Sequence, residues 1–121
     1  MQWSTTVRNA FLDNIEATIG TSAVLKIRTG AAPANCGSAD SGTVLATLSL
    51  ASDWMAAAAS GSKAKAGTWQ DASADAGGTI AHYRLYASDG TTCHSQGTCG
   101  TGGELVTATD TVTTGQTFTG N

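Results

Sequence analysis

Near the start of the chain, apolar residues recur every four positions, which places them on one stripe of an α-helix. These residues are Val7, Phe11, Ile15 and Ile19. Ser4 or Thr5 can cap the beginning of the helix, and Gly20 can end it. The pattern therefore predicts a helix over residues 5–19. A helix of about four turns is marginal in isolation, so we expect it to dock on its own sheet or on a neighbouring subunit.

After this helix the pattern changes to the alternation of apolar and polar residues that is typical of half-buried β-strands. Alternation or a threonine-rich composition predicts strands at 23–29, 43–50, 64–70, 79–87, 104–109 and 111–119. Residues 30–42 contain the only proline, Pro33, and favour a long loop. A short helical turn is expected over the alanine-rich residues 54–59.

Two glycine-containing pairs indicate turns. Asp89-Gly90 is a hairpin signal, and Thr114-Gly115 indicates a bend or bulge in the last strand. The polar, glycine-rich segment 93–99 is expected to form a loop. One helix and six or seven strands predict an all-β fold, a single β-sandwich of jelly-roll or immunoglobulin-like type over residues 23–121, preceded by a helical arm over residues 1–22.

The composition favours a surface that packs against other proteins. Charged residues are 12% of the chain, against about 25% in ordinary soluble domains. Alanine, threonine, serine and glycine together make up more than half of it. The net charge is −3, and the six basic residues are scattered. Because no basic stripe is present to neutralise phosphates, we expect no binding to nucleic acid.

The sequence also gives expectations about the cellular compartment. The chain does not begin with a basic segment followed by an apolar one, so we expect no signal peptide. Its longest purely apolar run, residues 55–59, is far shorter than the ~20 residues that span a bilayer. We therefore expect synthesis in a cytosol and no insertion into a membrane.

The three cysteines, Cys36, Cys93 and Cys99, do not form a fully paired framework. Cys93 and Cys99 could bridge a loop after oxidation, but reduced thiols are favoured in a reducing cytosol. With His94 the cysteines have the ligand types that zinc prefers. However, five residues separate Cys93 from Cys99, and adjacent Cys93 and His94 would point to opposite sides of a strand. We expect no metal site.

No catalytic pattern is evident. His82 lies within a predicted strand and has no partner that the sequence identifies. A G-x-S-x-G nucleophile motif and a phosphate-binding glycine loop are both absent from the sequence. Asp71, Asp75 and Asp89 lie in predicted turns, where aspartate commonly binds its own backbone. We therefore expect no enzymatic activity and no cofactor.

The three tryptophans, Trp3, Trp54 and Trp69, admit two interpretations. A sugar-binding module would display aromatic rings on one face. The favoured interpretation is that Trp54 and Trp69 anchor the core or a subunit interface, because each tryptophan buries a large area.

Several short motifs, in order, cover nearly the whole chain. They are Ile19-Gly20, Gly-Ala-Ala-Pro at 30–33, Ser-Gly-Thr-x-Leu-Ala at 41–46, Ser-Asp-Trp at 52–54, Gly-Thr-Trp-x-Asp at 67–71, an aromatic-basic strand at 82–86 and Gly-Gln-Thr at 115–117. In this order the chain resembles a family of small phage and prophage virion proteins. It departs from that family in the elaborated 93–99 segment and in a last strand that ends soon after Gly115.

The resemblance implies a virion structural protein, assembled in the host cytoplasm. We expect a capsid decoration (cement) protein that binds the major capsid protein or other virion proteins and forms a homo-oligomer such as a trimer. A tail or head-fibre adhesin that binds host glycan is the alternative, and a small metalloenzyme or hydrolase is a third, less favoured class. The expected interface residues are Trp3, Val7, Phe11, Ile15, Trp54 and Trp69.

Overall fold

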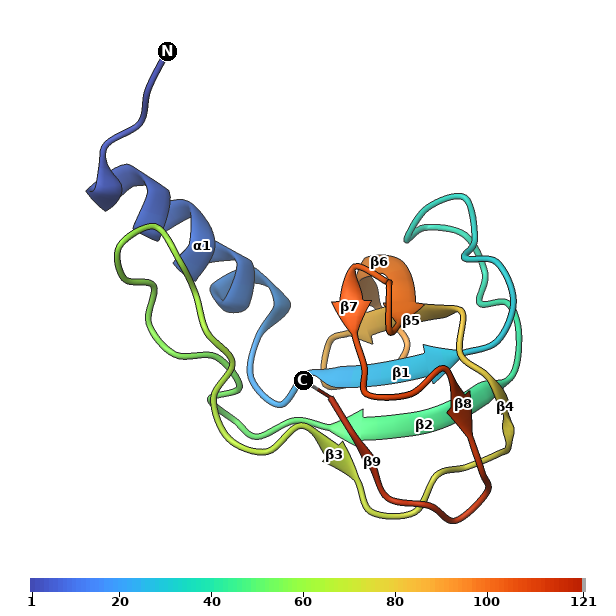
Figure 1. Ribbon diagram of the computed structural model, residues 1–121. Coiled ribbons are helices and arrows are strands. Elements are labelled where there is room, and N and C mark those ends of the chain that lie inside the picture. Colours follow the sequence, from blue (N-terminus) through green and yellow to red (C-terminus); the bar gives the residue numbers. More distant parts are fainter. Residues whose placement is uncertain (121) are drawn as a thin grey trace.

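A computed structural model describes residues 1–120, which form one helix followed by nine short strands (Figure 1). The elements are α1 (Thr5–Ile19), β1 (Val24–Arg28), β2 (Val44–Ser49), β3 (Gln70–Asp71), β4 (Gly78–Thr79), β5 (His82–Tyr86), β6 (Cys93–Gly100), β7 (Leu105–Val106), β8 (Thr111–Val112) and β9 (Phe118–Thr119). The chain is therefore mostly β-sheet, with a single short helix.

Five strands form the main sheet, in the order β2-β1-β5-β6-β7. All neighbours in it are antiparallel except β6 and β7, which run parallel. The sheet curls into half of a barrel, and the short pairs β3–β9 and β4–β8 lie along its open side (Figure 1). Helix α1 stands at one end of the molecule, next to the segment that follows β2.

The apolar core lies on one face of the main sheet. Leu25 is paired with Leu48 on one side and with Leu85 on the other, so the three side chains share this face. The core is completed from outside the sheet by Trp54, Trp69, Ile80, Val112 and Phe118. Full burial of one such large side chain stabilises the fold by roughly 1.5–3 kcal/mol.

The two buried tryptophans are joined to each other and to the end of the helix. The indole Nε1 of Trp54 donates a hydrogen bond to the carbonyl of Gly20 at 2.8 Å, and that of Trp69 donates to the carbonyl of Trp54 at 3.2 Å. Their ring centroids lie 5.9 Å apart. Each ring thus buries its apolar body while its one polar group stays satisfied.

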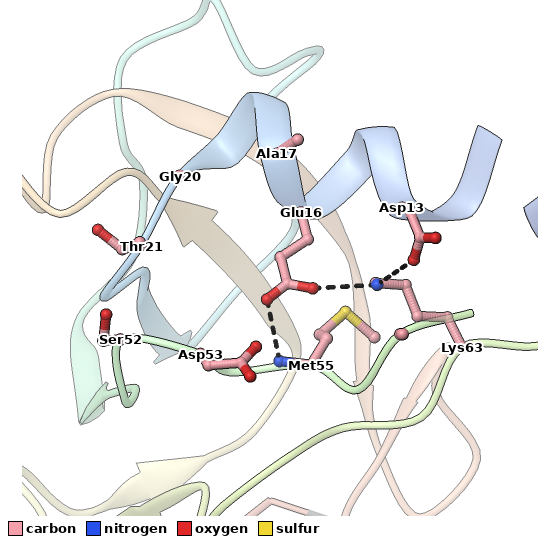
Figure 2. Close-up of a pocket in the computed structure, with 10 residues that line it drawn as sticks. Asp13, Glu16, Ala17, Gly20, Thr21, Ser52, Asp53, Met55 and Lys63 are labelled. Atoms are coloured by element: carbon pink, nitrogen blue, oxygen red, sulfur yellow. Dashed lines mark hydrogen bonds and ion pairs between the residues drawn. The ribbon is translucent and has the colours of Figure 1, made fainter. Parts of the chain in front are cut away.

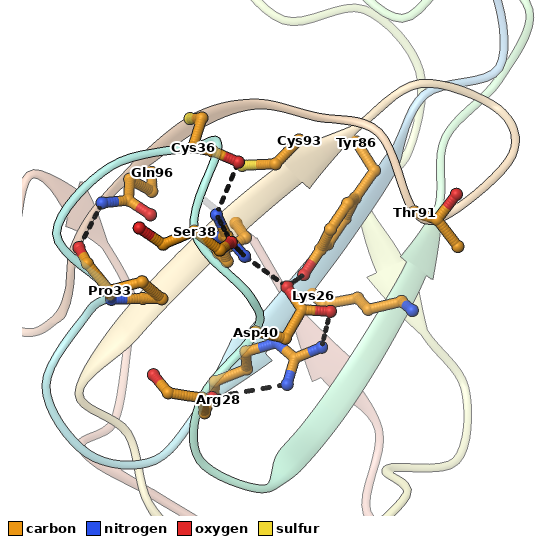
Figure 3. A network of polar contacts seen from close by, with 12 residues as sticks. Lys26, Arg28, Pro33, Cys36, Ser38, Asp40, Tyr86, Thr91, Cys93 and Gln96 are labelled. Carbon is orange, nitrogen blue, oxygen red and sulfur yellow. Dashed lines mark hydrogen bonds and ion pairs between the residues drawn. The ribbon is translucent and has the colours of Figure 1, made fainter.

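The opposite face of the sheet is buried as well, but it is polar. Loop 30–42 covers it, as Figure 3 shows. Arg84 in β5 is only 1% exposed beneath this loop. Its guanidinium donates to the loop carbonyls of Asn35 (3.2 Å), Cys36 (3.0 Å) and Ser38 (3.2 Å), and it pairs with the carboxylate of Asp40. The loop backbone therefore folds around one buried cation.

Asp40 joins two further groups to this cluster. Its carboxylate lies 3.1 Å from the guanidinium of Arg28 and accepts a hydrogen bond from the Tyr86 hydroxyl at 2.6 Å. Burial acts to raise the pKa of Asp40, but the hydrogen bonds from Tyr86 and Arg84 and the two positive charges outweigh it and lower the pKa below its ordinary value. Asp40 therefore stays ionised between two buried arginines.

The elements that were predicted from local sequence signals agree best with the structure. Helix α1 has the predicted bounds, and loop 30–42 and the hairpin turn at Asp89-Gly90 are confirmed. At Thr114-Gly115 the structure has a turn between β8 and β9 in place of the expected bend or bulge within one strand. The helical turn predicted at 54–59 is wrong: residues 55–65 form an irregular hairpin, with bridges between Met55 and Lys65 and between Ala59 and Ser62. Positive φ angles at the hairpin tip, in Ser60 and Gly61, allow the chain to reverse there.

The predicted strands near the end of the chain needed the largest corrections. The loop predicted at 93–99 is instead β6, the longest strand, which pairs with β5. The strand predicted at 64–70 is reduced to β3, and the one predicted at 111–119 is divided into β8 and β9. Strand pairing decided each case, because these segments lack a clear alternation of their own. β6 pairs with β5 across the adjacent hairpin turn, whereas the short strands pair with segments distant in the sequence.

The buried charge cluster yields a stability prediction. Asp40→Asn keeps the side-chain size but leaves Arg28 and Arg84 buried without their counter-charge. Because the Asp40 carboxylate is itself partly exposed, we expect a loss of about 2–3 kcal/mol in the free energy of unfolding. Urea denaturation at neutral pH measures this loss.

Asp75→Asn is the matched control, since the exposed Asp75 carboxylate accepts a hydrogen bond from the Thr47 hydroxyl and pairs with no arginine among the described residues. We expect its cost to stay below about 1 kcal/mol. Equal losses in the two variants would show that the arginine cluster is not what Asp40 stabilises.

Candidate protein interface

Helix α1 forms for local reasons. The Ser4 hydroxyl accepts a hydrogen bond from the backbone N–H of Val7 at 3.2 Å, and the Gly20 N–H donates to the carbonyl of Glu16 at 2.9 Å. Gly20 adopts a φ of 94°, which glycine tolerates without steric cost. Both ends of the helix are therefore capped by groups that the sequence supplies within one turn.

The apolar stripe of the helix does not enter the core. Of its four residues only Ile19 is buried. Phe11 is 55% exposed and Ile15 50% exposed. Trp3, just before the helix, is 52% exposed and packs edge-on against Phe11, with ring centroids 5.6 Å apart. We call Trp3, Val7, Phe11 and Ile15 the arm surface.

The polar side of the helix is what attaches it to the rest of the molecule (Figure 2). Three side chains at helical spacing accept hydrogen bonds of 2.8–3.4 Å from backbone N–H groups of the 55–65 hairpin. They are Asn9, Asp13 and Glu16. The helix is thus held by hydrogen bonds, and its apolar stripe is turned away from the surface that holds it.

Lys63 closes this attachment. Its ammonium lies 2.7 Å from Asp13 and 3.0 Å from Glu16, and it donates to the carbonyl of Ala56 at 2.8 Å. The hydrogen bond from Lys63 lowers the pKa of Asp13. Burial raises the pKa of Glu16, but the hydrogen bond and charge of Lys63 and the backbone N–H of Met55 outweigh it, so that this pKa is also lowered. We call Asp13, Glu16 and Lys63 the clamp.

A cavity of about 420 Å³ lies between the clamp and residues 52–57 (Figure 2). It is open to solvent, and its lining mixes the clamp with Gly20, Thr21, Ser52 and Met55. Asp13 and Glu16 both bind Lys63, and the carboxylate of Asp53 also lines the cavity. The ion pairs with Lys63 tie the helix to the hairpin.

A second cavity, of about 220 Å³, is almost entirely apolar and lies beside the arm surface. Ile15 and Ile19 of the helix line one side, and Leu25, Leu85 and Leu105 of the sheet line the other. Trp54 and Trp69 lie beneath it. We call it the apolar groove. Since Ile15 belongs to both, the arm surface and the groove form one continuous apolar region.

The structure separates the six predicted interface residues into two groups. Trp3, Val7, Phe11 and Ile15 form the arm surface. Trp54 and Trp69 are 1% and 9% exposed, so of the two expected roles, core anchor or interface anchor, the structure shows the core one. Sequence reasoning missed the clamp. Asp13 and Glu16, on the helix side opposite the stripe, indicate that this side binds something polar. Their partner Lys63 could not be identified from the sequence, because it is about fifty residues away.

The other candidate chemical groups are dispersed. His82 is buried, and its Nδ1 lies 2.7 Å from the carbonyl of Gly30, which ties the loop to β5. His94 is exposed at a bulge in β6. Within residues 1–120, no three His, Cys, Asp or Glu side chains gather closely enough to hold a metal ion. In the same range, no helix combines the length and apolar character needed to cross a bilayer.

Comparisons with protein-family models, with curated proteins and with solved structures found no match for this chain.

The clamp predicts how the helix responds to acid. The pKa values of Asp13 and Glu16 lie below their ordinary values of 3.8 and 4.5 in the folded protein. The clamp's contribution to stability is therefore complete above those ordinary values and is lost as the pH falls through the lowered ones. Lys63→Met should move both pKa values upward, as measured by NMR titration of the side-chain carboxyl carbons.

Lys65→Met serves as the control, because Lys65 binds the carbonyl of Gly120 and not the helix. It should leave the pKa values of Asp13 and Glu16 unchanged. If Lys63→Met had no greater effect than this control, Lys63 would not be the group that holds these carboxylates ionised.

Proposed function

We propose that this chain is a non-enzymatic structural protein of a phage particle, a capsid decoration protein that binds the major capsid protein lattice. The observation that carries this proposal is the arm surface. Three large apolar side chains stand about half exposed on a helix whose polar side is anchored to the protein itself. An exposed apolar region of this kind is typical of a surface that another protein covers.

Three features support a role in a symmetric particle. The ordered motifs resemble virion proteins, the low charge suits close packing against protein, and the arm surface continues into the apolar groove. Many copies on a repeating lattice gain avidity, so each single contact can be weak. We propose homo-oligomers, such as trimers at symmetric lattice positions, on virions assembled in the host cytoplasm, without nucleic acid or membrane as partners.

We further propose that residues 23–121 act as one β-sandwich domain and residues 1–22 as its arm. The curled main sheet would be one layer, and the pairs β3–β9 and β4–β8 would contribute the other. Support comes from Val112 and Phe118, which reach the core from these short pairs.

A host-glycan adhesin is less well supported. Such a protein needs exposed aromatic rings to stack on sugars, and two of the three tryptophans are buried. An enzymatic role has little support as well, because His82 is buried against the loop backbone and burial raises the pKa of the Cys99 thiol to about 11.

The arm surface can be tested directly. The double variant Phe11→Asp, Ile15→Asp places two charges in the proposed interface, and we expect at least a tenfold loss of binding to capsids that lack this protein. Co-sedimentation with purified capsids measures the binding, and circular dichroism verifies that the variant is folded.

Thr6→Asp, Ala10→Asp adds the same charge to exposed helix positions away from the stripe and should bind normally. Deleting residues 1–17, which spares the buried Ile19 and the Gly20 carbonyl that binds Trp54, should likewise abolish binding while the sheet stays folded. Normal binding by the arm variant, with the fold intact, would contradict the proposed interface.

The copy number distinguishes the two virion roles. A decoration protein should be present in hundreds of copies per particle, as measured by gel densitometry of purified virions. A handful of copies, together with glycan-array binding that is lost in Trp3→Ala, would instead identify an adhesin.

A further inference from the structure

Two of the three cysteines lie next to each other on the polar face of the sheet. Cys36 belongs to loop 30–42 and Cys93 begins β6, and both are free thiols that are half-buried. Figure 3 shows the Cys93 side chain pointing toward Cys36, and the two are close enough for Cys36 to alter the pKa of Cys93. Residues 57 apart in sequence are thus brought side by side.

The neighbourhood holds both cysteines in place. The Cys36 carbonyl accepts a hydrogen bond from Arg84 at 3.0 Å, which fixes the loop over the sheet. Cys93 is paired with Tyr86 in the β5–β6 ladder. Since Arg84 and Tyr86 both bind Asp40, one cluster positions the backbones that carry the two thiols.

A bulge in β6 determines which face Cys93 occupies. Leu85 pairs with Ser95, but Tyr86 pairs with Cys93, so His94 is an extra residue in the ladder. Without this bulge Cys93 would share a face with Ser95 and Cys99, because all three have odd numbers. The bulge turns Cys93 to the polar face, beside the loop.

Cys99 cannot replace Cys36 as the partner. It is buried in the apolar core on the opposite face. It also lies six residues along the same strand, which corresponds to ~20 Å, whereas bridged cysteines have Cα atoms within about 7 Å. A Cys93–Cys99 bridge, considered from the sequence, is therefore incompatible with this fold.

We propose that Cys36 and Cys93 form a disulfide when the protein meets an oxidising environment, and that this bond fastens loop 30–42 to β6. The oxidant is a low-molecular-weight disulfide such as oxidised glutathione. One cysteine thiolate attacks it, breaks its S–S bond and releases one glutathione thiol. The second cysteine then attacks the protein sulfur of the mixed disulfide and releases the other glutathione. Two protein thiols are oxidised and one small disulfide is reduced to two thiols.

The buried position of Cys93 makes this thiol–disulfide exchange slow at neutral pH. Burial and then the neighbouring Cys36 side chain raise the pKa of Cys93 to about 11, although the charge of Arg84 acts in the opposite direction. The thiolate, which is the reactive form, is therefore scarce at neutral pH. The pair stays reduced in a cytosol and closes after release from it. This chemistry does not depend on the proposed virion role.

Oxidised glutathione provides the test on the full-length protein. After incubation, alkylation of the denatured protein and mass spectrometry should show one remaining thiol, and the bridge should persist in Cys99→Ala. It should be absent from Cys36→Ser and Cys93→Ser, with Cys36→Ala as a second variant whose thermal melt verifies folding. Closing so long a loop should raise the Tm by roughly 10 °C over the reduced form.

Several results would overturn the proposal. They are three free thiols after prolonged incubation, a bridge between Cys93 and Cys99, a glutathione adduct that never closes, or a crosslinked dimer that depends on Cys36. A Tm increase of the same size in oxidised Cys36→Ser would likewise show that a Cys36–Cys93 disulfide does not cause the increase.

Discussion

Arg84 lies at the centre of β5, the strand in the middle of the main sheet, and it is almost completely buried. A buried guanidinium is costly unless it is paired, so the chain around it must supply carbonyls and a carboxylate to its two terminal nitrogens, while its Nε has no partner among the described residues. Loop 30–42 does so, and Asp40 extends the cluster to Arg28 and Tyr86. The position of the loop, and with it of Cys36, follows from this one charge.

Because one face of the sheet is devoted to this polar cluster, the apolar core is confined to the other face. That core is covered by Trp54, Trp69 and the short strands near the end of the chain. The helix contributes only Ile19 to it, and Gly20 at the end of the helix accepts the hydrogen bond of Trp54. Hydrogen bonds and the clamp hold the helix instead, and its stripe stays outside. Because the protein itself does not cover this stripe, the arm surface is the strongest candidate for contact with a partner.

The two proposals concern opposite faces of the main sheet, because the arm surface continues into a groove on the apolar face and Cys93 lies on the polar face. They depend on different physics. The arm surface offers apolar area that a partner can cover, so the favourable free energy of burying it is gained only when a partner binds. The Cys36–Cys93 pair offers a covalent reinforcement of the loop that already covers the polar face. A protein that is made in a reducing cytosol and then exposed to an oxidising medium would gain this stability only after the exposure.

The sequence by itself determined helix α1, loop 30–42 and the turns at 89–90 and 114–115, because caps, periodicity and glycine act within a few residues. It also identified the arm stripe. Only the tertiary structure decided that β6 is a strand, that Trp54 and Trp69 are internal, that Arg84 is buried and that Cys93 faces Cys36. β6 depends on its pairing with β5 across the adjacent hairpin turn, and the other three features depend on residues far apart in the chain. In each case strand pairing, a bulge or burial overrides local preference.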